Sequence, residues 1–205
     1  MIITTKEKIK QAALTLFAQK GYEGTTMSDI AEVVGINKAS IYNHYRGKED
    51  LFLTVYKDVA SDYELLNERV IKHAQTLDVP ERIQYVFEER VLYYYRKPEL
   101  QAFWNQITLF TPAAFLKEYW DDILKREEHL QEFMEETFSE GMQRGLIRRD
   151  NPYKLMSSFR AMEEGLLNWM IAFPGSEEGL VKEIWVDLWL GMKERGDNFE
   201  EGQGI

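Results

Sequence analysis

The sequence predicts an all-α protein built from two domains, with a boundary near residue 50. Apolar residues recur at three- and four-residue spacings along almost the whole chain, and only five prolines interrupt its 205 residues. Hydrophobic residues make up 44% of the chain, and five Trp, eleven Phe and eleven Tyr supply enough bulk for a packed core. We expect about nine helices, divided between residues 1–50 and residues 51–205.

The chain lacks the sequence features of secreted and membrane proteins. It has no cysteine, which removes disulfides, thiol nucleophiles and Cys-ligated zinc. No apolar run approaches the roughly 18 to 20 residues of a membrane span, and the N-terminus has no signal-peptide core. We therefore expect a cytoplasmic protein with no membrane partner.

The first two predicted helices are short and amphipathic. A helix over residues 4–20 places Ile9, Ala12, Ala13, Leu16 and Phe17 on one face. A second helix over residues 27–34 has Thr26 as a natural N-cap, and Asp29 three residues later completes a capping-box pattern. Both helices therefore have one face that must be covered by the rest of the N-terminal domain.

A glycine turn joins the second helix to a third over about residues 38–45. Gly35 accepts the left-handed backbone that a tight turn needs, and Asn37 caps the next helix. Ile41 and Tyr45 are four residues apart and face the protein, so the remaining side chains face solvent or a partner. This layout is typical of a helix-turn-helix, although hairpins of two short helices are more often structural.

The outward residues of the third helix are of types that contact DNA. Lys38, Tyr42 and His44 can donate to phosphate oxygens, and Ser40 and Asn43 can hydrogen-bond base edges. A small side chain at position 39 permits close approach or contact with a thymine methyl. The predicted DNA-contact set is Thr26, Lys38, Ala39, Ser40, Tyr42, Asn43, His44 and Lys48.

Residues 6–53 resemble the DNA-binding domain of the TetR family of transcriptional regulators. The matching positions are Gly21-Tyr22, Thr25-Thr26, Ile30-Ala31, Gly35, Lys38, Tyr42-Asn43-His44-Tyr45 and Lys48-Glu49. The chain departs from the family pattern at Ala39, where glycine is frequent, and at Ser40-Ile41. The resemblance implies a dimer that binds operator DNA and a central domain whose effector alters the spacing of the two DNA-binding heads.

Charge is distributed unevenly between the two predicted domains. Residues 1–50 carry seven Lys or Arg and six Asp or Glu, a net charge of +1. Because the whole chain has a net charge of −10, residues 51–205 carry −11. Such asymmetry orients the N-terminal domain toward a polyanion. It also predicts weak non-specific DNA binding, because few side chains neutralise phosphates.

Six further helices are expected in the C-terminal domain. Their approximate ranges are 48–76, 80–97, 99–110, 113–144, 153–173 and 177–195, followed by a polar tail over 196–205. If the first of these is one continuous rod of about 40 Å, a small tilt at one end moves the DNA-binding domain considerably. We expect this helix to act as a lever.

The last two helices carry more apolar surface than one helical hairpin can hide. We therefore predict a homodimer held by a four-helix interface, and we weigh it above a monomeric core. The predicted interface residues are Phe159, Leu166, Ile184, Trp185, Leu188 and Trp189.

Aromatic residues are concentrated in the central helices. Each taken alone is more often core, but together they favour a small-molecule pocket. The predicted pocket residues are Tyr93, Phe103, Trp104, Phe110, Tyr119, Trp120, Phe138, Met162 and Trp169. Nearby carboxylates, among them Asp122 and Glu163, would suit a lipophilic cation.

The sequence contains no motif typical of an enzyme. Phosphate-binding loops, dinucleotide-binding glycine motifs and helical metal-binding motifs are all absent, and His44, His73 and His129 lie on separate predicted helices. We expect no enzyme activity, no metal and no cofactor. The predicted function is a dimeric repressor that binds a palindromic operator and is released by a small hydrophobic or amphipathic effector. The alternative is a DNA-bound interaction protein that recruits another protein without an effector.

Overall fold

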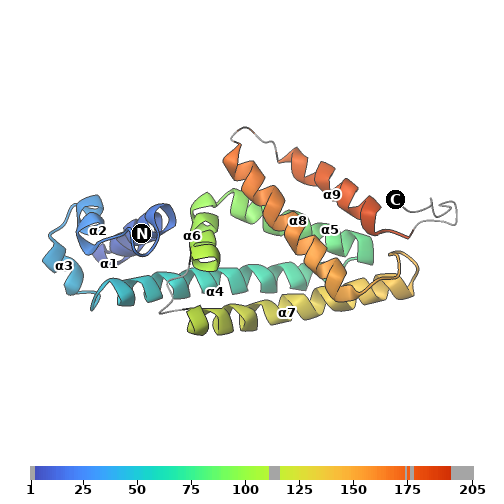
Figure 1. The fold of residues 1–205 in the computed structure, drawn as a ribbon, viewed down its shortest axis with the longest axis horizontal. Coiled ribbons are helices and arrows are strands. Elements are labelled where there is room, and N and C mark those ends of the chain that lie inside the picture. Colours follow the sequence, from blue (N-terminus) through green and yellow to red (C-terminus); the bar gives the residue numbers. More distant parts are fainter. Residues whose placement is uncertain (1–2, 111–115, 174, 176–177, 195–205) are drawn as a thin grey trace, which may run out of the picture. The chain divides into compact units, whose positions relative to one another are not determined.

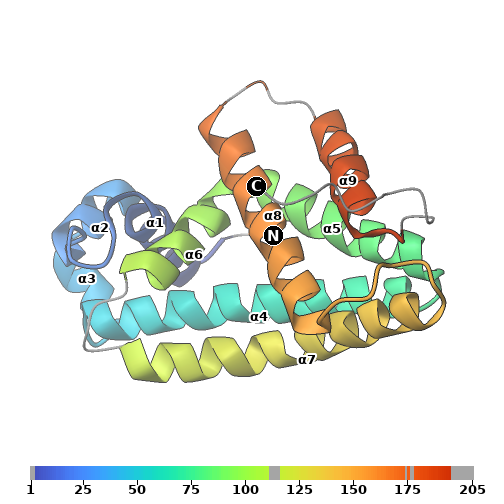
Figure 2. The same cartoon turned by 45° about the vertical axis from the view of Figure 1, so that its right-hand side comes forward.

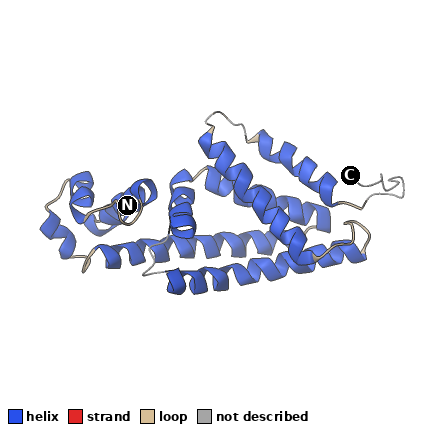
Figure 3. Cartoon of the chain, viewed as in Figure 1, coloured by secondary structure: helices blue, strands red, loops and turns tan. Residues whose placement is uncertain are grey.

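A computed structural model describes residues 3–110, 116–173, 175 and 178–194, without the side chains of 116–120. Helices account for the secondary structure of this part of the chain, and its one β feature is an isolated bridge between Ile147 and Lys193 (Figure 3). The helices are α1 (Thr5–Lys20), α2 (Met27–Val34), α3 (Lys38–Tyr42), α4 (Lys48–Ala74), α5 (Val79–Tyr95), α6 (Pro98–Phe110), α7 (Leu116–Gln143), α8 (Pro152–Ala172) and α9 (Gly179–Met192) (Figure 1). The predicted all-α fold is confirmed. No described helix combines the length and the apolar character that crossing a membrane requires.

The chain packs into two compact units. Unit 1 comprises Met1–Leu65 and Lys97–Leu124, and unit 2 comprises Leu66–Arg96 and Lys125–Ile205. Helices α4 and α7 therefore contribute residues to both units. The predicted domain boundary near residue 50 stays a prediction about function. By packing, the first part of α4 and all of α6 belong with the N-terminal helices.

Local capping interactions explain where the helices of unit 1 begin. Thr4 and Glu7 form a capping box on α1, and Thr26 and Asp29 form one on α2. In the second box the Asp29 N–H donates to Thr26 Oγ1 at 3.1 Å, and the Thr26 N–H donates to Asp29 Oδ2 at 2.9 Å. These bonds satisfy backbone donors that have no partner inside the helix, so the predicted cap at Thr26 is confirmed.

Helix α6 packs mainly against α1 within unit 1. Phe103 and Ile107 are buried in the same hydrophobic core as Ile9, Phe17 and Phe52. At the start of α6 the Glu99 carboxylate accepts hydrogen bonds from Gln11 Nε2 at 2.9 Å and from Thr15 Oγ1. The DNA-binding helices predicted from sequence therefore share one core with α6.

In unit 2, α8 packs across α5, and α9 contacts both of them (Figure 2). The rings of Phe87 and Phe138 both meet Phe159 edge to face in the centre of this core. A backbone hydrogen bond joins the end of α9 to the α7–α8 connection: the Arg148 N–H donates to Met192 O at 3.0 Å. The sequence reading correctly placed a turn in this connection and missed the bridge.

Several helices are shorter than predicted. Helix α3 ends at Tyr42, and the turn that follows still directs Tyr45 inward: its N–H donates to Ile41 O at 3.0 Å and its hydroxyl to Lys6 O at 3.4 Å. Helix α4 ends at Ala74, and α9 spans Gly179–Met192. The predicted tail over 196–205 and the first three residues of the predicted helix over 113–144 lie outside the described residues.

Candidate nucleic-acid interface

The turn between α2 and α3 has the geometry of a helix-turn-helix. Gly35 ends α2 in the left-handed conformation with φ of 74°. This conformation favours glycine because a Cβ would be strained there. The Ile36 N–H donates to Ala31 O at 3.0 Å, and Asn37 Oδ1 accepts from the Ala39 N–H at 2.9 Å to begin α3. The predicted roles of Gly35 and Asn37 are confirmed.

Helix α3 and the turn after it present a polar face to solvent. Ile41 and Tyr45 point inward, with exposed fractions of 0% and 3%. The structure brings together on this outer segment the exposed Lys38, Ala39, Tyr42, Asn43 and His44 and the half-buried Ser40. Thr26 is exposed at the start of α2, where its hydroxyl caps the helix. This surface offers donors and acceptors of the kinds that contact phosphates and base edges.

The inner side of this surface is held by polar contacts that the sequence reading missed. Thr25 is fully buried, and its hydroxyl donates to Gly21 O at 2.8 Å while lying 3.1 Å from Leu16 O. Burial raises the pKa of Tyr45 to about 12, so its hydroxyl stays protonated and able to donate. Both groups fix the position of α2 and α3 relative to α1.

Lys48 lies against the protein. Its Nζ donates to Tyr22 O at 2.8 Å and lies 4.1 Å from the centroid of the Tyr22 ring. Burial raises the pKa of Tyr22, whose ring also contacts Phe17 and Phe52. The ammonium therefore ties the first residue of α4 to the α1–α2 connection through a cation–π contact and a hydrogen bond.

Replacing Lys48 by methionine should lower the free energy of unfolding by about 1 kcal/mol, because the cation–π contact and the hydrogen bond are both lost. Chemical denaturation checks this value. We expect the dependence of DNA affinity on salt to stay unchanged, since the ammonium is directed at Tyr22. A slope reduced by about one would support the phosphate contact predicted from sequence.

The predicted dimer residues divide into two groups. Phe159, Leu166, Trp185 and Leu188 are buried inside unit 2 of the single chain, while Ile184 and Trp189 are half-buried. The first four are therefore core residues of the unit, and charged substitutions at Trp185 or Leu188 would test its folding. The large apolar side chains left exposed on α8, at its C-cap and on α9 include Tyr153, Met162, Trp169, Phe173, Val186 and Leu190.

The predicted pocket residues are distributed over both units. In unit 1, Phe103 is buried, Trp104 is half-buried and Phe110 is exposed at the end of α6. In unit 2, Phe138 is buried, Tyr93 meets Tyr94 edge to face, and Met162 and Trp169 are exposed. The side chains of Tyr119 and Trp120 lie outside those described. Whether these residues share a pocket stays a prediction.

Two of the carboxylates considered for a cationic ligand, Glu163 and Asp122, already have partners. Glu163 is 5% exposed, and its Oε1 accepts from Arg90 Nε at 3.1 Å. Arg90 Nη1 also donates to Asn67 Oδ1. Asp122 accepts from the Tyr56 hydroxyl at 2.6 Å. The described residues contain no group of three or more His, Cys, Asp or Glu arranged to hold a metal ion.

Sequence comparisons match the N-terminal part of the chain. A family model described as bacterial regulatory proteins, tetR family, matches residues 9–55. IcaR of Staphylococcus epidermidis, a negative transcriptional regulator of the biofilm operon icaADBC, is 53% identical over 47 residues, 23% of this chain and 25% of IcaR. IcaR of Staphylococcus aureus is 35% identical over 85 residues, 40% of this chain and 44% of IcaR. The match thus spans less than half the length of these relatives.

Structural similarity extends over nearly the whole chain. The ketosteroid transcriptional regulator KstR2 of Mycobacterium tuberculosis superposes with a TM-score of 0.78 at 16% identity, covering 95% of this chain and 98% of KstR2. AibR, solved in complex with isovaleryl coenzyme A and operator DNA, superposes with a TM-score of 0.70 at 26% identity, covering 91% of this chain and 98% of AibR.

Proposed function

Because the chain belongs to the TetR family of bacterial regulatory proteins, we propose that it acts as a repressor that binds a palindromic operator as a homodimer and is released by a small effector. It is a DNA-binding transcriptional regulator and not an enzyme. In this proposal the site of action is the cytoplasm, where the operator DNA lies.

The observation that carries the proposal is the exposed polar face of α3 above the buried Ile41 and Tyr45. In the proposed complex this helix enters the major groove, as the second helix of a helix-turn-helix does. Lys38, Tyr42 and His44 contact phosphates, and Ser40 and Asn43 contact base edges. Ala39 allows the helix to approach the bases closely.

A second copy of the chain is the proposed partner of α8 and α9. The rings of Trp169 and Phe173 contact each other in a tilted arrangement, with centroids 4.2 Å apart, and both side chains remain exposed. Val186 and Leu190 are exposed on α9. Exposed large apolar side chains are typical of an interface where they form a patch. A two-fold dimer also supplies the two heads that a palindromic operator requires.

Effector release is proposed to work through α4. This helix is continuous over 27 residues, or about 40 Å, and it contributes to both units. AibR, with 26% identity, was solved with both isovaleryl coenzyme A and operator DNA, which supports a ligand-responsive fold. An effector would lower operator affinity by its differential affinity for the two states, about 1 to 3 kcal/mol.

The recognition face can be tested on a duplex selected from random DNA by the wild-type protein. Tyr42→Ala should weaken binding to all sequences, because Tyr42 is a phosphate contact, and Tyr42→Phe isolates the contribution of the hydroxyl. Asn43→Ala should instead cost about 1 to 3 kcal/mol on the selected duplex and relax preference at one base pair. Binding titrations on the selected and point-changed duplexes measure both effects. Unchanged affinity in Tyr42→Ala and Asn43→Ala would remove α3 from the interface.

The alternative of a DNA-bound recruiter is favoured by the same exposed apolar residues on α8 and α9. The oligomeric state separates the two functions. A homodimer in solution covers this surface with a second copy, whereas a monomer at high concentration leaves it for another protein.

A further inference from the structure

The indole N–H of Trp104 is buried without a hydrogen-bond partner among the described residues. Buried indole N–H groups usually have a partner, because an unpaired buried donor is costly. Trp104 lies on α6 in unit 1 and is half-buried as a residue. The site therefore holds an unsatisfied donor beside a surface that solvent reaches.

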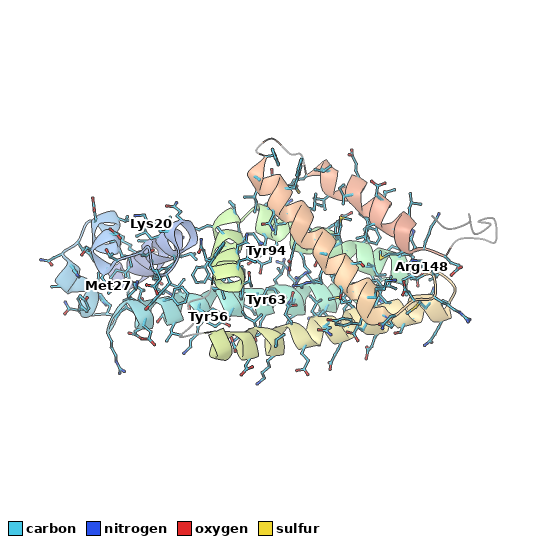
Figure 4. The ribbon with its side chains drawn as sticks, viewed as in Figure 1. Lys20, Met27, Tyr56, Tyr63, Tyr94 and Arg148 are labelled. Carbon is cyan, nitrogen blue, oxygen red and sulfur yellow. The ribbon has the colours of Figure 1, made fainter. Side chains whose placement is uncertain are left out.

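Two tyrosines of α4 surround this indole. The ring centroids of Tyr56 and Tyr63 lie 6.2 and 5.6 Å from that of Trp104, both edge to face. Figure 4 labels them two turns apart on the part of α4 that runs past α6. A buried water satisfies such a donor where it finds two to four polar partners. Here the neighbours are the buried rings of Tyr56 and Tyr63, an aromatic environment that suits an apolar body carrying one acceptor atom.

We propose that Trp104 donates its indole hydrogen bond to the effector, and that the effector is an amphiphile whose carbonyl or carboxylate oxygen meets this N–H while its apolar part lies against Tyr56 and Tyr63. The inference rests on the proposed ligand-responsive function and names the chemical class of its effector. It replaces the lipophilic cation considered from sequence. A quaternary ammonium offers no acceptor to the indole, and Asp122 already accepts from Tyr56.

The position of Trp104 also explains how such a ligand affects DNA binding. The N–H is covered in this conformation, so an oxygen reaches it only when a neighbouring side chain moves. Trp104 is flanked on α6 by Phe103 and Ile107, which are buried in the core shared with α1. Glu99 further ties α6 to α1 through Gln11. Movement at Trp104 is therefore transmitted within the unit that carries α1, α2 and α3.

The test uses two probes with the same ten-carbon chain, decanoate and decyltrimethylammonium, on the 205-residue chain bound to its selected duplex. Only decanoate carries an oxygen acceptor. The chain has five tryptophans, and the Trp104→Phe variant identifies the indole N–H signal of Trp104 in a ¹H–¹⁵N spectrum. Phenylalanine keeps an aromatic ring against α4 and removes the donor.

We expect decanoate to shift the Trp104 indole signal and to release the duplex, and Trp104→Phe to bind decanoate about tenfold more weakly, with release in each protein referred to its own duplex affinity. The inference is overturned if decanoate leaves the signal unmoved or binds the variant as tightly as the wild type. If decyltrimethylammonium alone releases the duplex, equally from the wild type and from Trp104→Phe, the ligand-responsive function is supported and the Trp104 site is wrong. If decanoate shifts the Trp104 signal without releasing the duplex, the site is supported and the ligand-responsive function is wrong. If neither probe has an effect, both the site and the function are wrong.

Discussion

Replacing Trp169 and Leu190 by arginine together should convert the protein into monomers and lower its affinity for a palindromic operator at least about 100-fold. Both side chains are exposed in the single chain, at 56% and 47%, so the change leaves the core of unit 2 intact. In the proposed dimer the arginines enter a desolvated interface without partners, which is strongly unfavourable. A monomer then binds through one head and loses the gain from two linked contacts.

Sedimentation equilibrium and titration with whole and half operators test this expectation. Affinity for an isolated half-site should stay unchanged, because α3 is untouched. The matched control replaces Leu65 and Leu124, which are also exposed, by arginine. This control variant should remain dimeric. If the Trp169 and Leu190 variant stays dimeric, the interface lies on another surface of the chain.

The helix-turn-helix could be predicted from the sequence because its determinants are local. Thr26 caps a backbone group three residues away, and Gly35 is identified by the left-handed turn it must adopt. Ile41 and Tyr45 share a face because of helical periodicity alone. None of these inferences depends on knowing what the helices pack against.

The inward face of α8 and α9 could not be predicted in the same way. Apolar residues surround both helices, so periodicity leaves more than one candidate stripe. The structure buries Trp185 and exposes its neighbour Val186, and it buries Leu166 while exposing Trp169. The choice depends on where α5 lies, which is tertiary information.

Polar contacts between distant residues were also beyond sequence reasoning. Lys48 and Tyr22 are 26 residues apart, and Arg90 and Glu163 are 73 apart. From sequence, a lysine beside a predicted recognition helix indicates a phosphate contact, and a glutamate near aromatic residues indicates a ligand for a cation. Only the packing of helices shows that each already has a partner inside the protein.

Arg90→Met should destabilise unit 2 by about 3 to 5 kcal/mol near neutral pH, the largest effect on stability that we expect from one substitution. The side chains of Arg90 and Glu163 are 7% and 6% exposed. Without the guanidinium, the buried Glu163 must keep an unpaired charge or take up a proton, and its Oε2 has no hydrogen bond and lies 3.8 Å from Arg160 Nε. Arg160 is itself paired with Glu127 at 3.0 Å, so its compensation of Glu163 is incomplete.

The loss of stability in Arg90→Met should shrink as pH falls. Burial raises the pKa of Glu163 above its ordinary value of 4.5, against the opposing effect of Arg90, and removing Arg90 raises the pKa further. A carboxyl with a raised folded pKa stabilises the fold fully below its ordinary pKa and loses that contribution as pH rises through the folded value. Denaturant unfolding at several pH values measures this slope.

Adding Glu163→Leu to Arg90→Met should recover most of the loss, because no buried charge remains. Equal stability of Arg90→Met and the wild type, or no recovery in the double variant, would show that the pair is not the source of the effect.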